Sequence, residues 1–321
     1  MKSFFILIQG PYTKNTEELI YQIKKILPNN EISLSCYDES INKDFLSKIS
    51  LKRSVDPGTI YVPPRGKPLN LHRQAKTVLK GCLGSSKEWV MKLRSDLEIK
   101  NLDKFKSFVN NIDIELKNDQ DLKLVTLNTG SLDIFSFYDM PLHFNDWFFI
   151  CKRDTLIKNC ERILTIPEIT LVSYFNKGLP KNYYHKNKYQ LRYHVEQLIH
   201  FADKFYRNNM IDYCCDLKIN NKFRHIIWVG KHLRLFSLKS IGICSSKVGY
   251  PTLESHLVGI SYGSLKIHKI ILNTKTWKRT ITFLVIYIHG GFRKYLFLLI
   301  RSFKKFLFFM KIFFRKLFKL I

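Results

Sequence analysis

The chain has 321 residues, 45% of them hydrophobic, and carries 53 Lys and Arg against 26 Asp and Glu. This ordinary apolar content excludes a disordered basic tail, and the length suffices for one large or two modest domains. The formal charge of +27 calls for an anionic partner: nucleic acid, an anionic membrane or a phosphorylated substrate. The seven cysteines form no CxxC pair, which argues against a disulfide framework or structural zinc site and favours a reducing compartment.

The first 150 residues alternate short apolar runs with segments of helical period, which is typical of a mainly parallel sheet flanked by helices. The expected elements are a strand at 4–9, a helix at 17–27 capped by Asn15 or Thr16, a strand at 31–37, a turn at 56–58, a strand at 59–62, a helix at 71–83 and a strand at 89–93. They continue with a short helix near 102–109, strands at 122–127 and 132–137, and helical sequence at 154–206. From residue 222 onward the pattern is mixed.

The positive charge is concentrated at the C-terminal end. Fourteen of the Lys and Arg residues, and no Asp or Glu, follow Glu254. Between 292 and 321 the cations fall within less than half of a helical circle, opposite Phe, Leu, Ile and Met. No stretch there reaches the ~20 uncharged apolar residues that span a bilayer, so this pattern indicates a helix lying on an anionic membrane surface. A core-packing helix with a solvated basic face is the alternative.

Lys92, Arg94 and Asp96 lie at the end of the strand expected at 89–93. Ligands of open α/β sheets collect outside the carboxyl ends of strands, so this cluster is well placed for a site. A carboxylate here can hold a divalent cation, Mg²⁺ or Mn²⁺, that neutralises a diphosphate, and Glu98 could share it. The alternative is a surface salt bridge.

Further candidates lie at a helix start and beside aromatic residues. The helix beginning at 70–74 offers its N-terminus and Arg73 to phosphate oxygens, unless it is an ordinary solvated first turn. Asp146 lies among aromatic residues, where desolvation would raise its pKa and suit a general base; a helix cap is equally compatible. Glu196 has the weakest claim, since a solvated helix face explains it.

Several of these segments resemble conserved motifs of the WavE-type lipopolysaccharide-synthesis family. In that family an N-x-x-R-Q helix leads through a Gly-Leu step to a K-x-R-[ST]-D strand end, and here the matching segments are Asn70 to Gln74, Gly81 to Leu83 and Trp89 to Asp96. Other matching pieces follow the family's order: Ile8 to Pro11, Leu34 to Tyr37, Asp146 to Phe149 and the pair Glu196-Gln197. The resemblance covers about residues 4 to 200.

The resemblance implies a GT-A-like glycosyltransferase, with a Rossmann-type nucleotide-sugar fold, that acts in synthesis of lipopolysaccharide, O-antigen or capsule. By position, Asp96 corresponds to the metal-binding acid of a D-x-D motif, whereas Arg94 replaces the first acid and could itself stabilise a departing diphosphate. Asp146 then becomes the expected base, with Glu196 as runner-up. The residues expected to bind the donor and its diphosphate are Gln9, Gly10, Asn70, Arg73, Gln74, Lys92 and Arg94.

We therefore expect a glycosyltransferase domain at 1–210, a poorly defined extension at 211–280 and a basic membrane-associating segment at 281–321. The expected partners are a nucleotide-sugar donor, a lipid-linked or growing glycan and an anionic membrane, which places the protein in the cytoplasm on the inner membrane face. A non-catalytic membrane scaffold is the alternative function. A nucleic-acid-binding protein is less favoured, because its cations should form a stripe on the folded domain.

Overall fold

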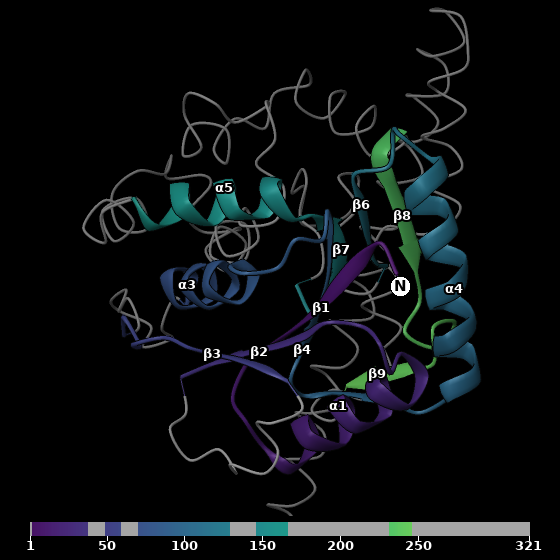
Figure 1. Ribbon diagram of the computed structural model, residues 1–321, viewed down its shortest axis with the longest axis horizontal. Helices are drawn as coiled ribbons and strands as arrows, with labels where there is room; N and C mark the ends of the chain where they lie inside the picture. The colour runs from purple at the N-terminus through teal and green to yellow at the C-terminus, as the bar shows by residue number, and fades with distance from the viewer. Residues whose placement is uncertain (1, 38–48, 59–69, 129–145, 166–230, 246–321) are drawn as a thin grey trace, which may run out of the picture.

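The computed structural model of the protein describes residues 2–37, 49–58, 70–128, 146–165 and 231–245 (Figure 1). In chain order, its helices and strands begin with β1 (Phe4–Gln9), α1 (Lys14–Ile26), β2 (Ile32–Cys36), β3 (Ser50–Arg53), α3 (Leu71–Cys82), β4 (Trp89–Arg94) and β5 (Leu97–Ile99). The remaining elements are α4 (Leu102–Asn118), β6 (Leu124–Leu127), β7 (Phe148–Lys152), α5 (Arg153–Leu164), β8 (Leu233–Phe236) and β9 (Ile243–Ser245). No helix among the described residues has the length and apolar character needed to cross a membrane.

The central sheet has seven strands in the order β3-β2-β1-β4-β7-β6-β8. β1 lies parallel to β2 and β4, β2 is parallel to β3, and β6 is parallel to β8. Of these seven strands β7 alone is reversed, because it pairs antiparallel with both β4 and β6. The mainly parallel, helix-flanked sheet expected from the sequence is therefore confirmed.

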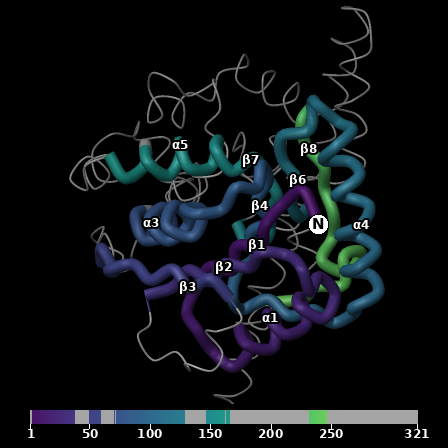
Figure 2. Tube along the Cα trace, in the orientation of Figure 1, coloured from purple at the N-terminus to yellow at the C-terminus, as the bar shows by residue number. Residues whose placement is uncertain are grey.

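One face of the sheet packs against α1 and α4 (Figures 1 and 2). Alternate residues of β1, such as Phe4, Ile6 and Ile8, point to this face and join the buried side chains of both helices in one apolar core. The ring of Phe108 on α4 meets that of Phe148 on β7 edge to face, with 5.7 Å between the ring centroids. This face is closed by apolar packing, and the charged motif residues are absent from that cluster.

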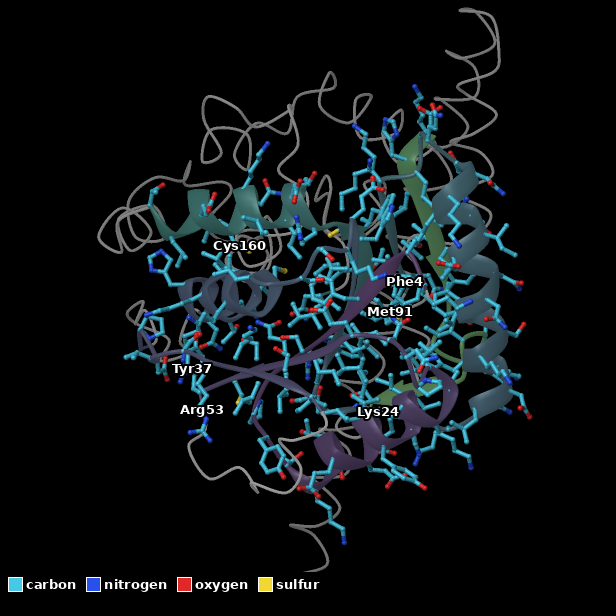
Figure 3. The ribbon with its side chains drawn as sticks, in the orientation of Figure 1. Phe4, Lys24, Tyr37, Arg53, Met91 and Cys160 are labelled. Carbon is cyan, nitrogen blue, oxygen red and sulfur yellow. The ribbon has the colours of Figure 1, made fainter. Side chains whose placement is uncertain are left out.

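The opposite face carries α3 and α5, which pack against each other above the sheet (Figure 1). α3 approaches the strands closely because residue 81 is glycine: a Cβ atom there would lie 2.3 Å from Leu7 Cδ1. Cys82, Cys151 and Cys160 come from α3, β7 and α5, and all three thiols are buried and unbridged. Figure 3 labels Cys160 on α5. Burial raises the pKa of Cys82 to about 12, so this thiol stays protonated and serves as a small core residue.

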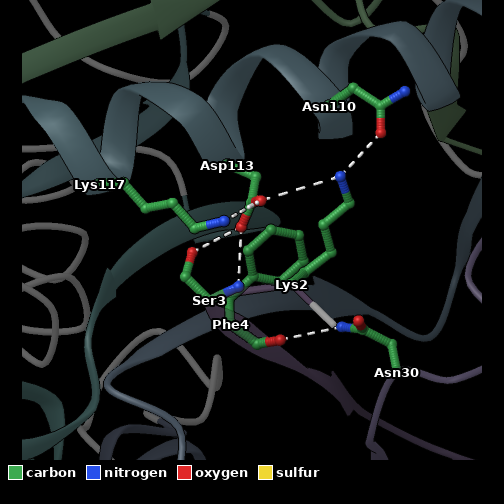
Figure 4. Close-up of polar contacts among 7 residues, drawn as sticks. All are labelled: Lys2, Ser3, Phe4, Asn30, Asn110, Asp113 and Lys117. Atoms are coloured by element: carbon green, nitrogen blue, oxygen red, sulfur yellow. Dashed lines mark hydrogen bonds and ion pairs between the residues drawn. The ribbon is translucent and has the colours of Figure 1, made fainter.

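Asp113 of α4 ties the start of β1 to the helix (Figure 4). Its carboxylate accepts hydrogen bonds from the main-chain N–H and the hydroxyl of Ser3, both at 2.7 Å, and from Lys117 at 2.9 Å. Lys2 Nζ lies 3.8 Å from the same carboxylate. These bonds hold the pKa of this carboxyl below its usual value, although burial acts in the opposite direction. The first strand is thereby anchored at its amino end.

The structure corrects several expected boundaries. α1 begins earlier than expected, because Thr13 and Thr16 form a reciprocal capping box in which Thr13, rather than Asn15 or Thr16, is the cap residue. The helix expected near 102–109 continues to Asn118. The sequence pattern does not predict β3 or β5, and at β7 it shows an aromatic segment without predicting a strand.

Other expectations lie outside the described residues. They concern the strands at 59–62 and 132–137, the helical sequence expected at 154–206 beyond residue 165, and the basic segment at 281–321. Within the extension expected at 211–280, the described residues 231–245 contribute β8 to the edge of the main sheet, beside β6 (Figure 2), and β9 to a pair with β5.

Candidate active site

A cavity of about 470 Å³ opens at the carboxyl ends of β1, β2 and β4 and the start of α3. In the sheet, β2 lies on one side of β1 and β4 lies on the other side. The strand order therefore changes direction at β1, and the cavity lies at this switch point, where α/β sheets bind ligands. Its lining residues are Gln9, Gly10, Pro11, Cys36, Tyr37, Asn70, Arg73, Gln74, Thr77, Lys92, Arg94, Ser95, Asp96 and Asp146.

The N-terminus of α3 is attached to the ends of β1 and β2. Gln9 Nε2 donates to Thr77 Oγ1 at 2.7 Å and to the main-chain oxygen of Gln74 at 3.2 Å. The Tyr37 hydroxyl donates to the main-chain oxygen of Arg73 at 2.6 Å. Asn70 makes no side-chain capping bond to the helix, and its buried Oδ1 has no hydrogen-bond partner among the residues that the structure describes. The helix start thus leaves an acceptor at the cavity wall.

Gly10 permits the tight turn between β1 and the cavity. Its φ of +137° is a conformation that residues with side chains rarely adopt, and a Cβ atom would lie 2.3 Å from Ser95 Oγ. The main-chain N–H of Ser95 donates to the Gln9 oxygen at 2.9 Å, so the turns after β1 and β4 are joined. Glycine is required here because both the backbone angle and the space exclude a side chain.

Arg73 forms the first of two arginine–carboxylate pairs on the cavity wall. Its guanidinium donates through two nitrogens to the two carboxylate oxygens of Asp56, one bond measuring 2.7 Å. It also lies over the ring of Tyr37, 5.7 Å from the centroid. These contacts lower the pKa of the Asp56 carboxyl, chiefly through the hydrogen bonds from Arg73. Burial raises the pKa of Tyr37 to about 12, so its hydroxyl stays neutral.

Arg94 forms the second pair at the end of β4. It donates to both oxygens of Asp96, with one bond at 2.8 Å, and lies 5.2 Å from the centroid of the Trp147 ring. Its main-chain N–H also donates to the Trp147 oxygen at 2.8 Å. Despite burial, the hydrogen bonds and negative charge of Asp96 keep the pKa of Arg94 raised. The Arg94 guanidinium therefore stays charged.

Lys92 is a charged side chain in the most buried part of the site. It is 1% exposed, and its Nζ donates to the main-chain oxygen of Asp146 and lies 5.5 Å from the centroid of the Phe149 ring. Burial lowers its pKa to about 8; the carboxylates of Asp146 and Asp96 oppose this shift, whereas Arg94 adds to it. The amine is therefore close to titration at neutral pH.

The described residues do not make a metal site in this arrangement. No group of three or more His, Cys, Asp or Glu side chains among them is placed to hold a cation. Asp96, the expected ligand, has both oxygens bonded to Arg94. Glu98, on β5, is not part of the cavity wall, since its carboxylate pairs with Lys100, which follows the strand, and neighbours the Cys244 thiol. Participation of Mg²⁺ or Mn²⁺ stays a prediction from the sequence.

Nine of the residues singled out in the sequence meet in this cavity: Gln9, Gly10, Asn70, Arg73, Gln74, Lys92, Arg94, Asp96 and Asp146. Glu196 lies outside the described residues. Sequence reasoning did not single out Thr77, Ser95 or Asp56. Thr77 lies one helical turn after Arg73, and Ser95 lies between Arg94 and Asp96, so their spacing from these residues indicates that both belong to the site. Asp56 reaches the site through its contact with Arg73, which lies in a different segment of the chain.

The fold and cavity define an α/β protein of Rossmann type with a charged ligand site at the switch point of its sheet. Residues 5–250 match the family described as WavE lipopolysaccharide synthesis, and because this match covers most of the sequence, the chain belongs to that family. The family resemblance seen in the motifs is thus confirmed. No curated protein matches the sequence.

Several solved structures share part of the arrangement at low sequence identity. The bifunctional IspDF from Campylobacter jejuni is 11% identical, with a TM-score of 0.33, 54% of this chain and 47% of that protein aligned. Glucosyl-3-phosphoglycerate synthase from Mycobacterium tuberculosis, in complex with Mn²⁺, UDP-glucose and phosphoglyceric acid, is 13% identical, with a TM-score of 0.33 and coverages of 48% and 58%. The chain therefore spans about half the length of these two proteins.

Proposed function

We propose that the protein is a glycosyltransferase that moves a sugar from a nucleotide-sugar donor to a hydroxyl of a lipid-linked or growing surface glycan. The observation that carries this proposal is the convergence of the family-type motif residues, from five separate segments, on one charged cavity. Membership of a family named for lipopolysaccharide synthesis supports the process. The cavity volume of about 470 Å³ lies within the range of small-molecule sites.

In the proposed reaction the acceptor oxygen forms a bond to the anomeric carbon of the donor sugar while the bond from that carbon to the diphosphate breaks. Asp146 takes the proton from the acceptor hydroxyl, and the nucleoside diphosphate leaves with an additional negative charge. The guanidinium of Arg94 at the cavity wall offsets that charge, as a fixed cation does most effectively in a partly buried site. The start of α3, with Asn70 and Arg73, binds the rest of the donor.

The test is turnover of a panel of UDP-, GDP- and ADP-sugars, measured as release of the nucleoside diphosphate with membrane lipid extract as acceptor. Asp146→Asn should lower kcat by a factor of about 10²–10⁴, because it removes the general base. Glu196→Gln is the matched variant for the runner-up base. Equal activity of the wild type and Asp146→Asn would remove the assignment of Asp146, and absence of turnover with every donor would overturn the proposed function.

We further propose that the basic segment at 292–321 holds the protein against the anionic inner face of the cytoplasmic membrane. The support is its sequence, in which one helical side is cationic and the other is rich in Phe, Leu and Ile. Co-sedimentation of the full chain with anionic vesicles should exceed that of a chain truncated before Phe292, whereas neutral vesicles should bind both weakly. Unchanged binding after truncation would contradict membrane attachment through this segment.

A further inference from the structure

Lys92 is a charged residue of the cavity wall whose side chain makes its contacts within the protein, away from the opening of the cavity. Its side chain is 1% exposed, compared with 28% for Arg94 on the same strand. Burying an ammonium is costly unless it is paired, so the partners of Nζ should explain why a lysine occupies a central strand. Those partners are the main-chain oxygen of Asp146 and the ring of Phe149.

Both partners belong to the segment that carries the proposed base into β7. β4 and β7 are antiparallel neighbours in which Lys92 lies opposite Phe149. Ladder pairing ends with Leu93 and Phe148, so Asp146 and Trp147 lie just beyond the sheet. Two bonds from β4 continue the attachment there, namely Lys92 Nζ to the Asp146 oxygen and the Arg94 N–H to the Trp147 oxygen. The first of these depends on a side chain and is therefore removable by mutation.

We infer that Lys92 is a positioning residue, which holds the main chain of Asp146 against the central strand so that its carboxylate faces the cavity. This assignment rests on the proposed function, because it is the role of Asp146 as base that makes its position matter. It replaces the contact with the donor diphosphate that the sequence motif suggested for Lys92. Arg94, which is more exposed, is left as the contact for the diphosphate.

The charge of Lys92 is part of this function. The charged groups facing it are Asp146 before β7, Arg94 on the same strand and Asp96 in the turn that follows. Because burial lowers the pKa of the amine to about 8, the ammonium form predominates below that pH and is lost above it. A neutral amine bonds the Asp146 oxygen more weakly than an ammonium does. We therefore expect kcat to fall as the pH rises through about 8.

The test compares Lys92→Met with Lys92→Arg, and uses Lys106→Met on the exposed side of α4 as a matched control for loss of a lysine. Lys92→Met should lower kcat about 100-fold, as displacement of a reacting group by an ångström does, and leave the KM for the donor within about twofold. Lys92→Arg should restore most of kcat and remove its decline near pH 8, because a guanidinium stays charged. The control should resemble the wild type.

Two kinetic results would overturn the inference: an increase in donor KM as large as the loss of kcat, or retention of the decline near pH 8 in Lys92→Arg. If Lys92→Met does not fold, the pH profile of Lys92→Arg decides alone. Hydrogen exchange of residues 146–149 gives a readout without turnover, and we expect faster exchange there in Lys92→Met. If the wild type turns over no donor, the proposed function fails, whereas unchanged exchange in Lys92→Met would reject the positioning role itself.

Discussion

Two arginine–carboxylate pairs on the wall of one cavity have the same chemistry and different surroundings. Arg73 with Asp56 and Arg94 with Asp96 are both two-pronged pairs, and each guanidinium lies over an aromatic ring. In the first pair both side chains are 34% exposed, whereas in the second the arginine is 28% and the aspartate 14% exposed. The second pair also lies beside the buried Lys92.

Burial, rather than the type of contact, distinguishes the two pairs. Water screens the Arg73–Asp56 pair, and exposed pairs of this kind contribute only about 0–1 kcal/mol to stability. Around Arg94 the medium is less polar, so each charge interacts more strongly with its neighbours and with an incoming anion. We therefore place the stabilisation of the departing diphosphate at Arg94 and binding of the remaining donor at Arg73.

Of variants in the two arginine–carboxylate pairs, Arg94→Met should have the larger effect. Loss of the guanidinium removes the fixed cation and leaves the Asp96 carboxylate without its partner, so kcat for donor turnover should fall by a factor of about 10²–10³. Steady-state kinetics with the preferred donor measure this loss, and circular dichroism checks the fold. A fall in kcat of less than about threefold would contradict the placement of charge stabilisation at Arg94.

A smaller effect is expected from Arg73→Met. Because Arg73 is more exposed and is assigned to donor binding, this variant should raise the donor KM by about tenfold or less and leave kcat nearly unchanged. Asp56→Asn is the matched control, since it removes the partner charge and retains the arginine. If Arg73→Met lowered kcat as much as Arg94→Met does, the two pairs would be equivalent and the comparison would fail.

The elements around the site were largely predictable because their patterns are local. The apolar run of β1 and the helical period of α3 are complete within each segment, and the structure places them at Phe4–Gln9 and Leu71–Cys82. β3, with the sequence Ser-Leu-Lys-Arg, was missed because it is short and polar at the sheet edge, where pairing with β2 defines it. At α1, capping chemistry between Thr13 and Thr16 decided the start.

The class of sheet, the family and most residues of the cavity wall can be read from the sequence, because strand ends and helix starts bring motif residues to one edge. The pairing of those charges depends on the folded arrangement, which brings Asp56 to Arg73, pairs Asp96 with Arg94 and buries Lys92 against the Asp146 main chain. The first and third of these contacts join residues 17 and 54 positions apart in the chain. Burial sets the electrostatic strength of all three, so no local pattern encodes them.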